Sequence, residues 1–521
     1  MTRMVLQALM LLWLANAAWA EPQVNEPIAI GSRLELFVDD HLIGKLTGAE
    51  LLLQKPTPRE VVMTNDAPWE GNECCYYSIF RSGDLYRMYY RGLHDGSLPG
   101  STTPSHRYFL CYAESRDARH WTKPNLDLVE FKGSKANNVL SLDAPGMFNF
   151  VAFEDTSPHC KPEERYKSLG TGPLLGLYAS KSHDGIHWSL MHNRPVITDG
   201  NFDSQNTALW DSVRHRYVAF YRDYRCRHCL KSLRRRVMPS GKHDEVFRCQ
   251  CRSIPADELK NSQLWRDIRT STSSDFVNWT DHGLLEYRGA PYEHLYTNTV
   301  MPYYRAPHIF ISFPKRFVPE RRPKDDPHGG VSDALFMTSR DGKVFRRWGE
   351  AIIRPGFQKD RWIDRNNMVA WGLTETTSAI PGTPNELSIY ASEGYKRGDS
   401  CRLRRYTYRI DGFVSVHAPL KGGELITKVL TFTGKELVIN FSTSAAGSIR
   451  VEIQDEHDNA VDGYSLSESP EIFGDSIEQV VRFKGGSDIS HLSVKTIRLQ
   501  FVMKDADLFS MRFQGGSHKG Q

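Results

Sequence analysis

The stretch Ser182-His-Asp-Gly-Ile-His-Trp188 decides the fold, because it recurs along the chain at long, regular intervals. The other copies are Ser115-Arg-Asp-Ala-Arg-His-Trp121, Ser273-Ser-Asp-Phe-Val-Asn-Trp279, Ser339-Arg-Asp-Gly342 with Trp348, and the weaker Arg409-Ile-Asp-Gly412. The first two copies start 67 residues apart, the third and fourth 66, and the last two 70. One such period has room for about four short strands, the content of one propeller blade. Five copies therefore predict a five-bladed β-propeller.

Within each copy we expect the phrase to form the turn between the last two strands of a blade. The Asp side chain can bond its own backbone, and a Gly can adopt positive φ. The phrase therefore marks the fold and does not carry chemistry. Only the interval from Ser182 to Ser273 is longer, at 91 residues, which predicts an insertion at residues 226–251 in blade three.

The two ends of the chain differ from this repeat. Arg3, the apolar run from Val5 to Ala18 and the small-residue site Ala18-Trp-Ala20 predict a signal peptide at residues 1–20. We therefore expect an exported protein, periplasmic or secreted. The propeller is predicted over residues 21–418. Alternating strands after it predict a β-sandwich over 419–513, followed by a flexible tail at 514–521.

Composition narrows the classes of function. The net charge of +4 is too small to indicate a nucleic-acid partner. After the signal peptide, no apolar run is long enough to cross a membrane. Aromatic residues make up 11% of the chain, which suits both β-sheet packing and sugar stacking.

Candidate site residues follow from the position of the strands within each blade. The first strand of a propeller blade starts on the face to which the second strand returns, so functional groups should lie just before the first or just after the second. We assign the candidate catalytic acids Glu73, Asp203, Glu293, Asp364 and Glu393. The candidate substrate-binding residues are Arg91, Arg222, Arg365, Asn206 and Asn298.

Carboxylates that converge in a water-filled funnel suit glycoside hydrolysis. That reaction needs one carboxylic acid to protonate the leaving oxygen and a second carboxylate as base or nucleophile. Glu73 and Asp203 are the preferred pair. Arginine forks match carboxylates and sulfates, so a poly- or oligosaccharide substrate that is acidic or sulfated is expected.

These features together resemble the five-bladed-propeller glycoside hydrolases of families 43 and 32. The resemblance rests on the hairpin from Ser78 to Tyr89 and on turns such as Asp184-Gly-Ile-His-Trp188. The opening Phe37-Val-Asp-Asp-His41 is similar to exported planctomycete-type proteins of this general fold. The resemblance implies a three-carboxylate site. The family's first-blade aspartate has its equivalent near Tyr76, and Glu73 is the nearest acid.

Two alternatives stay open at this point. A glycan-binding propeller without catalytic activity would explain the missing first-blade aspartate. A sialidase-like hydrolase would explain the repeated phrase, which is one residue shorter than the sialidase Asp-box. The chain has five copies where sialidases have six.

Four of the nine cysteines gather in the predicted insertion, as Cys226-Arg-His-Cys229 and Cys249-Gln-Cys251. Four thiolates at such spacing can hold a structural zinc ion. Two disulfides explain the same residues in an exported protein. No cofactor is required by the expected hydrolysis.

Overall fold

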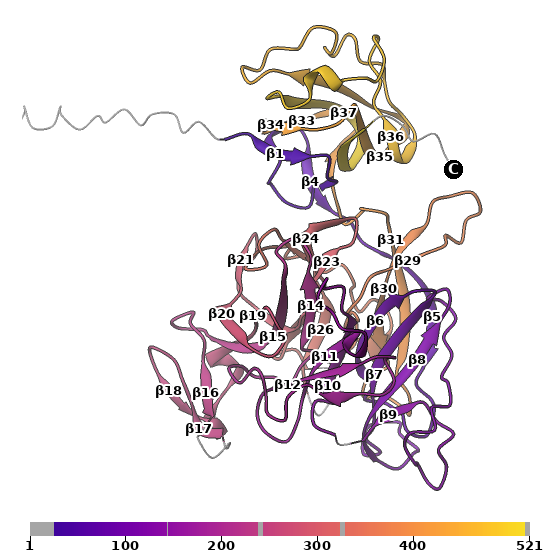
Figure 1. Ribbon diagram of the computed structural model, residues 1–521, viewed down its shortest axis with the longest axis vertical. Helices are drawn as coiled ribbons and strands as arrows, with labels where there is room; N and C mark the ends of the chain where they lie inside the picture. Colours follow the sequence, from indigo (N-terminus) through magenta and orange to yellow (C-terminus); the bar gives the residue numbers. More distant parts are fainter. Residues whose placement is uncertain (1–25, 143, 238–242, 323–328, 516–521) are drawn as a thin grey trace, which may run out of the picture.

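The computed structural model describes residues 26–142, 144–237, 243–322 and 329–515 of the chain (Figure 1). Within these ranges the protein is all-β: strands are joined by loops and by five one-turn 3-10 helices. The predicted signal peptide lies outside the described residues, as does most of the predicted tail. In the described part, no helix combines the length and apolar character needed to cross a membrane.

Three four-stranded sheets follow one another along the chain, and in each the strands pair antiparallel in sequence order. The first contains β6 (Cys75–Ser82), β7 (Leu85–His94), β8 (His106–Ser115) and β9 (Val139–Ser141). The second contains β10 (Phe148–Glu154), β11 (Tyr166–Thr171), β12 (Leu177–Ser182) and β13 (Ser189–Leu190). The third contains β14 (Thr207–Asp211), β15 (Arg216–Cys226), β19 (Leu264–Ser273) and β20 (Trp279–Leu284). Aromatic and β-branched residues dominate these strands, as half-buried pleated surfaces require.

The fourth sheet has the order β21-β28-β27-β24-β23, and a three-stranded sheet β22-β25-β26 comes from the same stretch of sequence. Their ranges are β21 (Glu286–Arg288), β22 (His294–Thr297), β23 (Met301–Tyr303), β24 (Ala306–Ser312), β25 (Lys315–Val318), β26 (Val331–Ala334), β27 (Met337–Ser339) and β28 (Val344–Arg347). The fifth sheet contains β29 (Thr374–Thr376), β30 (Glu386–Glu393) and β31 (Arg402–Arg409). Its outer strand is β5 (Thr57–Thr64), so residues from before the first sheet complete the last one.

Four copies of the repeated phrase join the last two strands of their sheets as predicted, whereas Arg409–Gly412 leads from β31 into the C-terminal sheet because β5 supplies the last strand of the fifth sheet. In the second sheet the phrase joins β12 to β13, where Asp184 Oδ1 accepts hydrogen bonds from the backbone amides of Ile186 and His187, both at 2.8 Å. Gly185 has a φ of +79°, the left-handed conformation that the phrase predicts. Trp188 packs edge-on against Phe150, with the ring centroids 4.9 Å apart. The phrase is therefore a structural turn.

A further sheet of eight strands contains most of the C-terminal region (Figure 1). Its C-terminal members are β32 (Val414–Ala418), β33 (Gly423–Thr427), β35 (Glu436–Gln454), β36 (Asp475–Val480) and β37 (Arg498–Gln514). The segment at residues 445–447, Ala-Ala-Gly, is part of the continuous strand β35, whose register against β37 shifts between Thr443 and Ser448. A bulge of this kind bends a strand without ending it.

The N-terminal boundary of the predicted domains needs correction. The strands β2 (Glu35–Leu36), β3 (Ile43–Thr47) and β4 (Glu50–Leu53) pair with β37, β33 and β32 of the C-terminal sheet. β1 (Ile28–Gly31) pairs parallel with β34 (Leu430–Phe432). Figure 1 shows these indigo strands beside the yellow C-terminal region. Residues 28–53 therefore belong with the C-terminal unit, because their strands pair with strands of that unit.

Candidate active site

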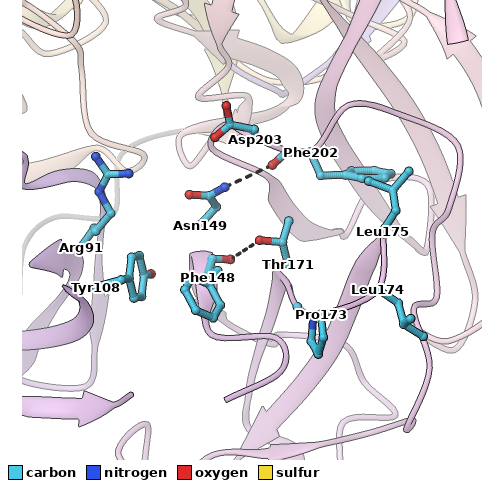
Figure 2. Close-up of a pocket in the computed structure, with 12 residues that line it drawn as sticks. Arg91, Tyr108, Phe148, Asn149, Thr171, Pro173, Leu174, Leu175, Phe202 and Asp203 are labelled. Atoms are coloured by element: carbon cyan, nitrogen blue, oxygen red, sulfur yellow. Dashed lines mark hydrogen bonds between the residues drawn. The ribbon is translucent and has the colours of Figure 1, made fainter. Parts of the chain in front are cut away.

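A cavity of about 670 Å³ opens where the first three sheets meet (Figure 2). Arg91, Asn149 and Asp203 form its polar side, and Figure 2 shows Asn149 between the other two. Aromatic and aliphatic side chains form the rest, with contributions from Tyr108, Phe148, Pro173, Leu174, Leu175 and Phe202. A cavity with an apolar wall and a few convergent polar groups is the usual form of a ligand site.

Beside this cavity lies a group of cations and phenols that we call the arginine–tyrosine cluster. It consists of Arg91, Arg222, Arg365, Lys315, Tyr76, Tyr296 and Tyr395. The Arg365 guanidinium lies 5.4–5.7 Å from the ring centres of all three tyrosines. The Lys315 ammonium lies 3.8 Å from the ring centre of Tyr296. The tyrosine rings hold these cations in place by cation–π attraction.

Tyr395 joins two of the arginines. Its hydroxyl accepts hydrogen bonds from Arg91 Nη2 at 2.9 Å and from Arg365 Nη1 at 2.7 Å. The same hydroxyl donates to Glu73 Oε1 at 3.2 Å. Arg91 is further fixed by the backbone carbonyl of Glu73, which accepts from its Nη2 at 2.9 Å. The Tyr395 hydroxyl therefore connects the fifth sheet to the first.

Three of the five predicted acids belong to this neighbourhood. Glu73 contacts Tyr395 as described and also lies 3.8 Å from the Lys396 ammonium. Asp203 lies 3.7 Å from Arg222 and has a side chain that is 72% exposed, so it is open to solvent and substrate. Asp364 accepts a hydrogen bond from Lys315 at 2.6 Å. The structure therefore brings Glu73, Asp203 and Asp364 to one cluster.

The other two predicted acids have different partners. Glu393 is 1% exposed, and both of its carboxylate oxygens accept hydrogen bonds from Arg404. Glu293 lies between Arg316 and Arg347. Both oxygens of the buried Glu393 carboxylate are already paired, and removing either partner of such a pair is destabilising, so we assign Glu393 a structural role.

The two predicted substrate-binding asparagines bond to the backbone instead. The Asn206 amide donates to the carbonyls of Phe202 and Ser204, both at 3.0 Å. Asn298 donates to the carbonyl of Phe220 at 3.0 Å. Both side chains are about 1% exposed or less, so they shape the segment that carries Asp203 and do not face the cavity. Another asparagine, Asn149 in β10, lines the cavity.

Three residues of this site have a left-handed backbone conformation. Tyr76, Asn149 and Arg365 have φ values of +57°, +48° and +61°, in the left-handed region that bulky residues avoid. Each such conformation costs about 1–3 kcal/mol, and it persists where the surroundings impose it. The register of β6 against β7 shifts between Cys75 and Ser78, next to Tyr76. This strain aims the Tyr76 side chain at the cluster.

The charges of the cluster alter the pKa values of its members. Burial alone would raise the pKa of Tyr296, but the positive charges of Arg365 and Arg222 outweigh burial and lower that pKa. Burial likewise opposes ionisation of Asp364, yet Lys315 and Arg365 hold its pKa below the usual range. Burial lowers the pKa of Lys315. Shifted groups of this kind are typical of functional sites.

Sequence reasoning placed the arginines in the site but missed the tyrosines. Tyr395 lies two residues after Glu393, just beyond the strand end at which a site residue was expected. β30 ends at Glu393, and Gly394 follows with a φ of +74°. Because the chain turns there, alternation along the strand no longer tells which side chain faces the site.

The sequence matches no protein-family profile and no curated protein. Among solved structures the chain is similar to one described as a glycoside hydrolase, at 12% identity and a TM-score of 0.39, over 67% of this chain and 92% of the other. A second is a structure of the glycoside hydrolase family 130 mannoside phosphorylases, which contain hydrolases that target β-1,2 mannosidic linkages in Candida mannan (10% identity, TM-score 0.38, 68% and 94%). A third is an α-L-arabinofuranosidase from Podospora anserina (8% identity, TM-score 0.36, 68% and 97%). These structural neighbours are glycoside hydrolases, but likenesses of this strength assign no activity, so the function is argued from the site.

Proposed function

We propose that this chain is an exported glycoside hydrolase that cleaves a poly- or oligosaccharide bearing an anionic group. One observation carries the proposal: Glu73 and Asp203 approach the same arginine–tyrosine cluster, beside a cavity of about 670 Å³. The acid–base pair and the anion site are therefore neighbours. Residues 1–20 supply the export signal in this reading.

The sheets support a five-bladed propeller in which the site occupies the axial funnel. Backbone hydrogen bonds link the first and fifth sheets, from Ile79 to the Trp371 carbonyl at 2.8 Å. The Gln205 amide, just before the third sheet, donates to Tyr77 in the first at 2.9 Å. Trp371 donates from its indole to the carbonyl of Val300, which directly precedes β23 of the fourth sheet, at 3.0 Å. Contacts of this kind between the first, third, fourth and fifth sheets support an arrangement of blades around one axis.

The two carboxylates have the different environments that hydrolysis requires. Asp203 is exposed beside Arg222, where a substrate oxygen or a water can reach it. Glu73 is mostly covered and accepts from Tyr395, which fixes its orientation. One carboxyl group must donate a proton to the leaving oxygen while the other acts as base or nucleophile. Unequal surroundings are what separate such roles.

The excess of cations favours an anionic substrate. The cluster contains three arginines and one lysine, and its carboxylate neighbours are Glu73, Asp203 and Asp364. Arginine presents a planar fork that matches carboxylate and sulfate oxygens. A uronic acid or sulfated sugar would complement the remaining positive charge and be oriented by it.

A second candidate function, binding of a glycan without catalysis, is favoured by one observation. Tyr76 lies near the position at which the resemblance to families 43 and 32 places an aspartate, and it is 1% exposed. A phenol has an ordinary pKa of about 10, so it is protonated at neutral pH and cannot act as the base that a carboxylate would provide. The chain would then keep the cavity and the anion site but lack one of the three acids.

The experiment replaces Glu73 by Gln and Asp203 by Asn and measures release of reducing ends from uronate-containing, sulfated and neutral glycans. Loss of a general acid or base lowers kcat by about 10²–10⁴-fold, and we expect that loss in both variants. Glu293→Gln is the matched control, because this carboxylate is paired with arginines outside the cluster. It should keep the turnover of the wild-type enzyme.

Two results would contradict the proposal. If both variants hydrolysed an active substrate at the wild-type rate, Glu73 and Asp203 would not be the catalytic pair. If the wild-type protein bound an acidic glycan in calorimetry and released no product from any substrate, the chain would be a glycan-binding module.

A further inference from the structure

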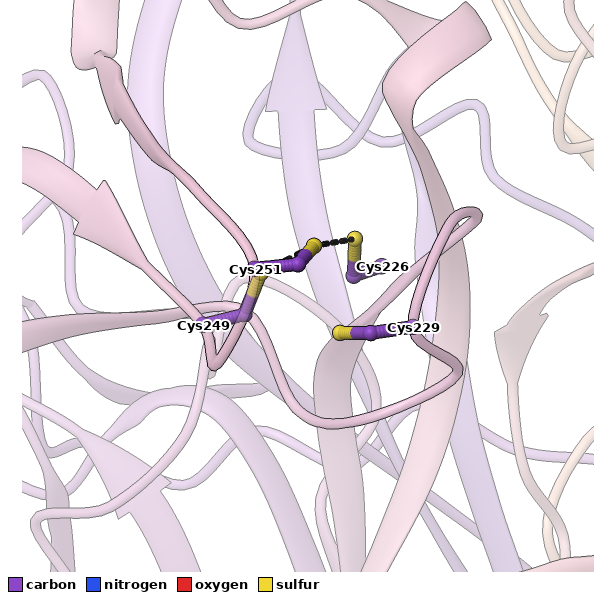
Figure 3. A group of neighbouring side chains, drawn as sticks. All are labelled: Cys226, Cys229, Cys249 and Cys251. Atoms are coloured by element: carbon purple, nitrogen blue, oxygen red, sulfur yellow. Dashed lines mark hydrogen bonds between the residues drawn. The ribbon is translucent and has the colours of Figure 1, made fainter.

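The four cysteines of the insertion come together at one point (Figure 3). Cys226 is the last residue of β15, and Cys229 lies in the turn that follows. Cys249 and Cys251 lie between β17 (His243–Arg248) and β18 (Ser253–Pro255). Their four Sγ atoms all lie within 4.8 Å of one another. Residues from two separate turns therefore form one group of sulfurs.

We propose that Cys226, Cys229, Cys249 and Cys251 bind one structural zinc ion, independently of the proposed hydrolysis. Cys226 Sγ lies 3.7 Å from Cys251 Sγ, and Cys249 Sγ lies 3.4 Å from Cys251 Sγ. Zinc binds thiolate sulfur at about 2.3 Å, so a tetrahedral site separates its sulfurs by about 3.8 Å. The observed spacings are close to that edge length.

The arrangement fits two disulfides less well. A disulfide brings its two sulfurs to about 2.0 Å and joins each sulfur to one partner. Here Cys251 lies near both Cys226 and Cys249, so no division into two separate pairs follows from the geometry. A central ion instead uses all four sulfurs at once.

The backbone of both turns suits such a site. The carbonyl of Cys226 accepts from the amide of Leu230 at 3.0 Å, and the amide of Cys226 donates to Lys231 at 2.9 Å. The amide of Cys249 donates to the carbonyl of Arg252 at 3.0 Å. These backbone hydrogen bonds close both turns, so each turn presents its two cysteines together before any metal binds.

The insertion needs an additional source of stability. It adds a three-stranded sheet of β16 (Arg234–Val237), β17 and β18 between β15 and β19. Its buried hydrophobic cluster is small: Cys226, Leu233, Phe247, Ile254 and Leu264. Units too small to bury a sufficient core depend on a metal or on disulfides. Because two ligands come from β15 and its turn and two from the insertion, the ion would fasten the insertion to the third sheet.

The surrounding charges complement the ion and its ligands. A zinc ion with four thiolates carries two net negative charges. Basic side chains border the neighbouring pocket that includes Cys249: Arg225, Lys231, Arg234, Arg248, Arg269 and Lys343. Their positive charge would complement the negative charge of a zinc ion bound to four thiolates.

The proposed site also lies next to a strand of the arginine–tyrosine cluster. Arg227, between the first two ligands, donates from Nε to the carbonyl of Leu264 at 2.9 Å. Its Nη2 lies 3.2 Å from Nε2 of His294, the first residue of β22, which also carries Tyr296. A fixed turn at 226–229 therefore holds Arg227 against the strand that presents Tyr296.

The test uses the full chain, produced with zinc in the medium and purified without chelator. Elemental analysis should give about one zinc per chain. Replacing zinc by cobalt should give the visible absorption bands of tetrahedral cobalt–thiolate coordination. Thiol alkylation after unfolding without reductant should modify all four cysteines of the cluster.

Variants separate the site from other cysteines. Cys229→Ser and Cys249→Ser should lose the zinc, whereas Cys160→Ser, a partly exposed cysteine outside the cluster, should keep it. Zinc retained in both cluster variants would overturn the proposal. So would a wild-type protein that contains no metal and has the four cysteines oxidised in pairs, and so would absorption spectra that identify iron.

If a cysteine variant fails to fold, metal exchange on the wild-type protein tests the proposal independently. Zinc removed with a mercurial reagent, which is then cleared with a thiol, should rebind at one equivalent and restore protection of residues 227–263 against a protease. No rebinding by a chain whose circular dichroism is unchanged would contradict the proposal.

Discussion

Arg365 Nη2 donates a hydrogen bond to the Tyr296 hydroxyl over 3.0 Å, and both residues are nearly buried. The contact joins the fifth sheet to β22. Because Arg365 and Arg222 stabilise the phenolate form, they lower the pKa of Tyr296 from its ordinary value near 10 despite burial. The site therefore contains a tyrosine that ionises more readily than others, beside two carboxylates.

Replacing Arg365 by Met should raise the pKa of Tyr296, because it removes the positive charge that donates a hydrogen bond to the phenol oxygen while the phenol stays buried. An alkaline titration followed by tyrosinate absorbance measures this change, and Tyr296→Phe identifies the signal. A charge-assisted hydrogen bond contributes about 1.5–3 kcal/mol, so the same variant should weaken binding of an anionic glycan by about 10–150-fold.

Arg365→Lys provides the comparison for that prediction, since it keeps the charge but loses the planar fork. It should hold the Tyr296 pKa low and restore only part of the binding. Equal affinity of the wild-type protein and Arg365→Met for an acidic glycan would show that this arginine does not bind the anion.

His294 should make the protein sensitive to acid. Burial, followed by the charges of Arg266 and Arg227, lowers the pKa of His294 from 6.5 to about 3. Between these values the unfolded chain binds a proton that the folded protein does not, so the free energy of unfolding falls as the pH decreases from about 6.5 to about 3. The slope from this one group approaches about 1.4 kcal/mol per pH unit.

Urea unfolding at several pH values measures that slope. His294→Gln should flatten it, whereas His187→Gln, with an exposed side chain, should not. If the proposed zinc site loses its ion in acid, that loss acts equally in both variants, so the difference between them isolates His294. Identical pH profiles for the wild-type protein and His294→Gln would contradict the assignment.

The regular parts of the fold could be predicted from the sequence, because each depends on local chemistry. The turn around Asp184 needs a short acidic side chain and a residue that accepts positive φ, and both are visible in the phrase. The pairing of β3 with β33 depends on residues almost 400 positions apart, and no local pattern reports it. The same holds for β5, which completes the fifth sheet from the N-terminal side.

Part of the candidate site could likewise be predicted from the sequence, and part could not. The rule on strand ends identified Arg91, Arg222 and Arg365, although Arg91 and Arg222 lie within β7 and β15 and Arg365 lies in the segment before β29. It did not distinguish Glu393 from Tyr395, since only the three-dimensional position of Arg404 shows that Glu393 is already paired. Residue type did not locate the asparagine of the site either, since Asn206 bonds to backbone carbonyls while Asn149 lines the cavity.

The turn interpretation predicts a loss of stability without a loss of activity. Asp184 accepts hydrogen bonds from two backbone amides and, at 2.7 Å, from His187 Nδ1. Asp184→Ala should lower the free energy of unfolding by about 1–3 kcal/mol, because those amides lose their acceptor. Asp184→Asn keeps one acceptor oxygen and should lose less. Chemical denaturation gives the stabilities, and an unchanged kcat in both variants is expected; a large fall in kcat with normal stability would instead indicate a catalytic role.

Replacing Tyr76 should have the opposite effect to replacing Asp184: stability is kept and substrate binding is weakened. Its side chain is 1% exposed, burial raises its pKa, and its hydroxyl has no hydrogen-bond partner among the described residues. A buried polar group without a partner costs about 1–3 kcal/mol, so Tyr76→Phe should leave the free energy of unfolding unchanged or raise it. If the neutral hydroxyl instead bonds to the substrate, the same variant should raise KM by about 2–10-fold.

Tyr90→Phe is the matched control, because Tyr90 is equally buried but its hydroxyl contacts Glu70 and accepts from Asn138 at 2.8 Å. Removing that hydroxyl leaves both partners unsatisfied and should destabilise the protein, with little effect on KM. If Tyr76→Phe behaved like Tyr90→Phe, the Tyr76 hydroxyl would have a structural partner and would not face a ligand. Stability measured together with KM therefore separates a phenol that holds the fold from one that the strained turn at residue 76 presents to a substrate.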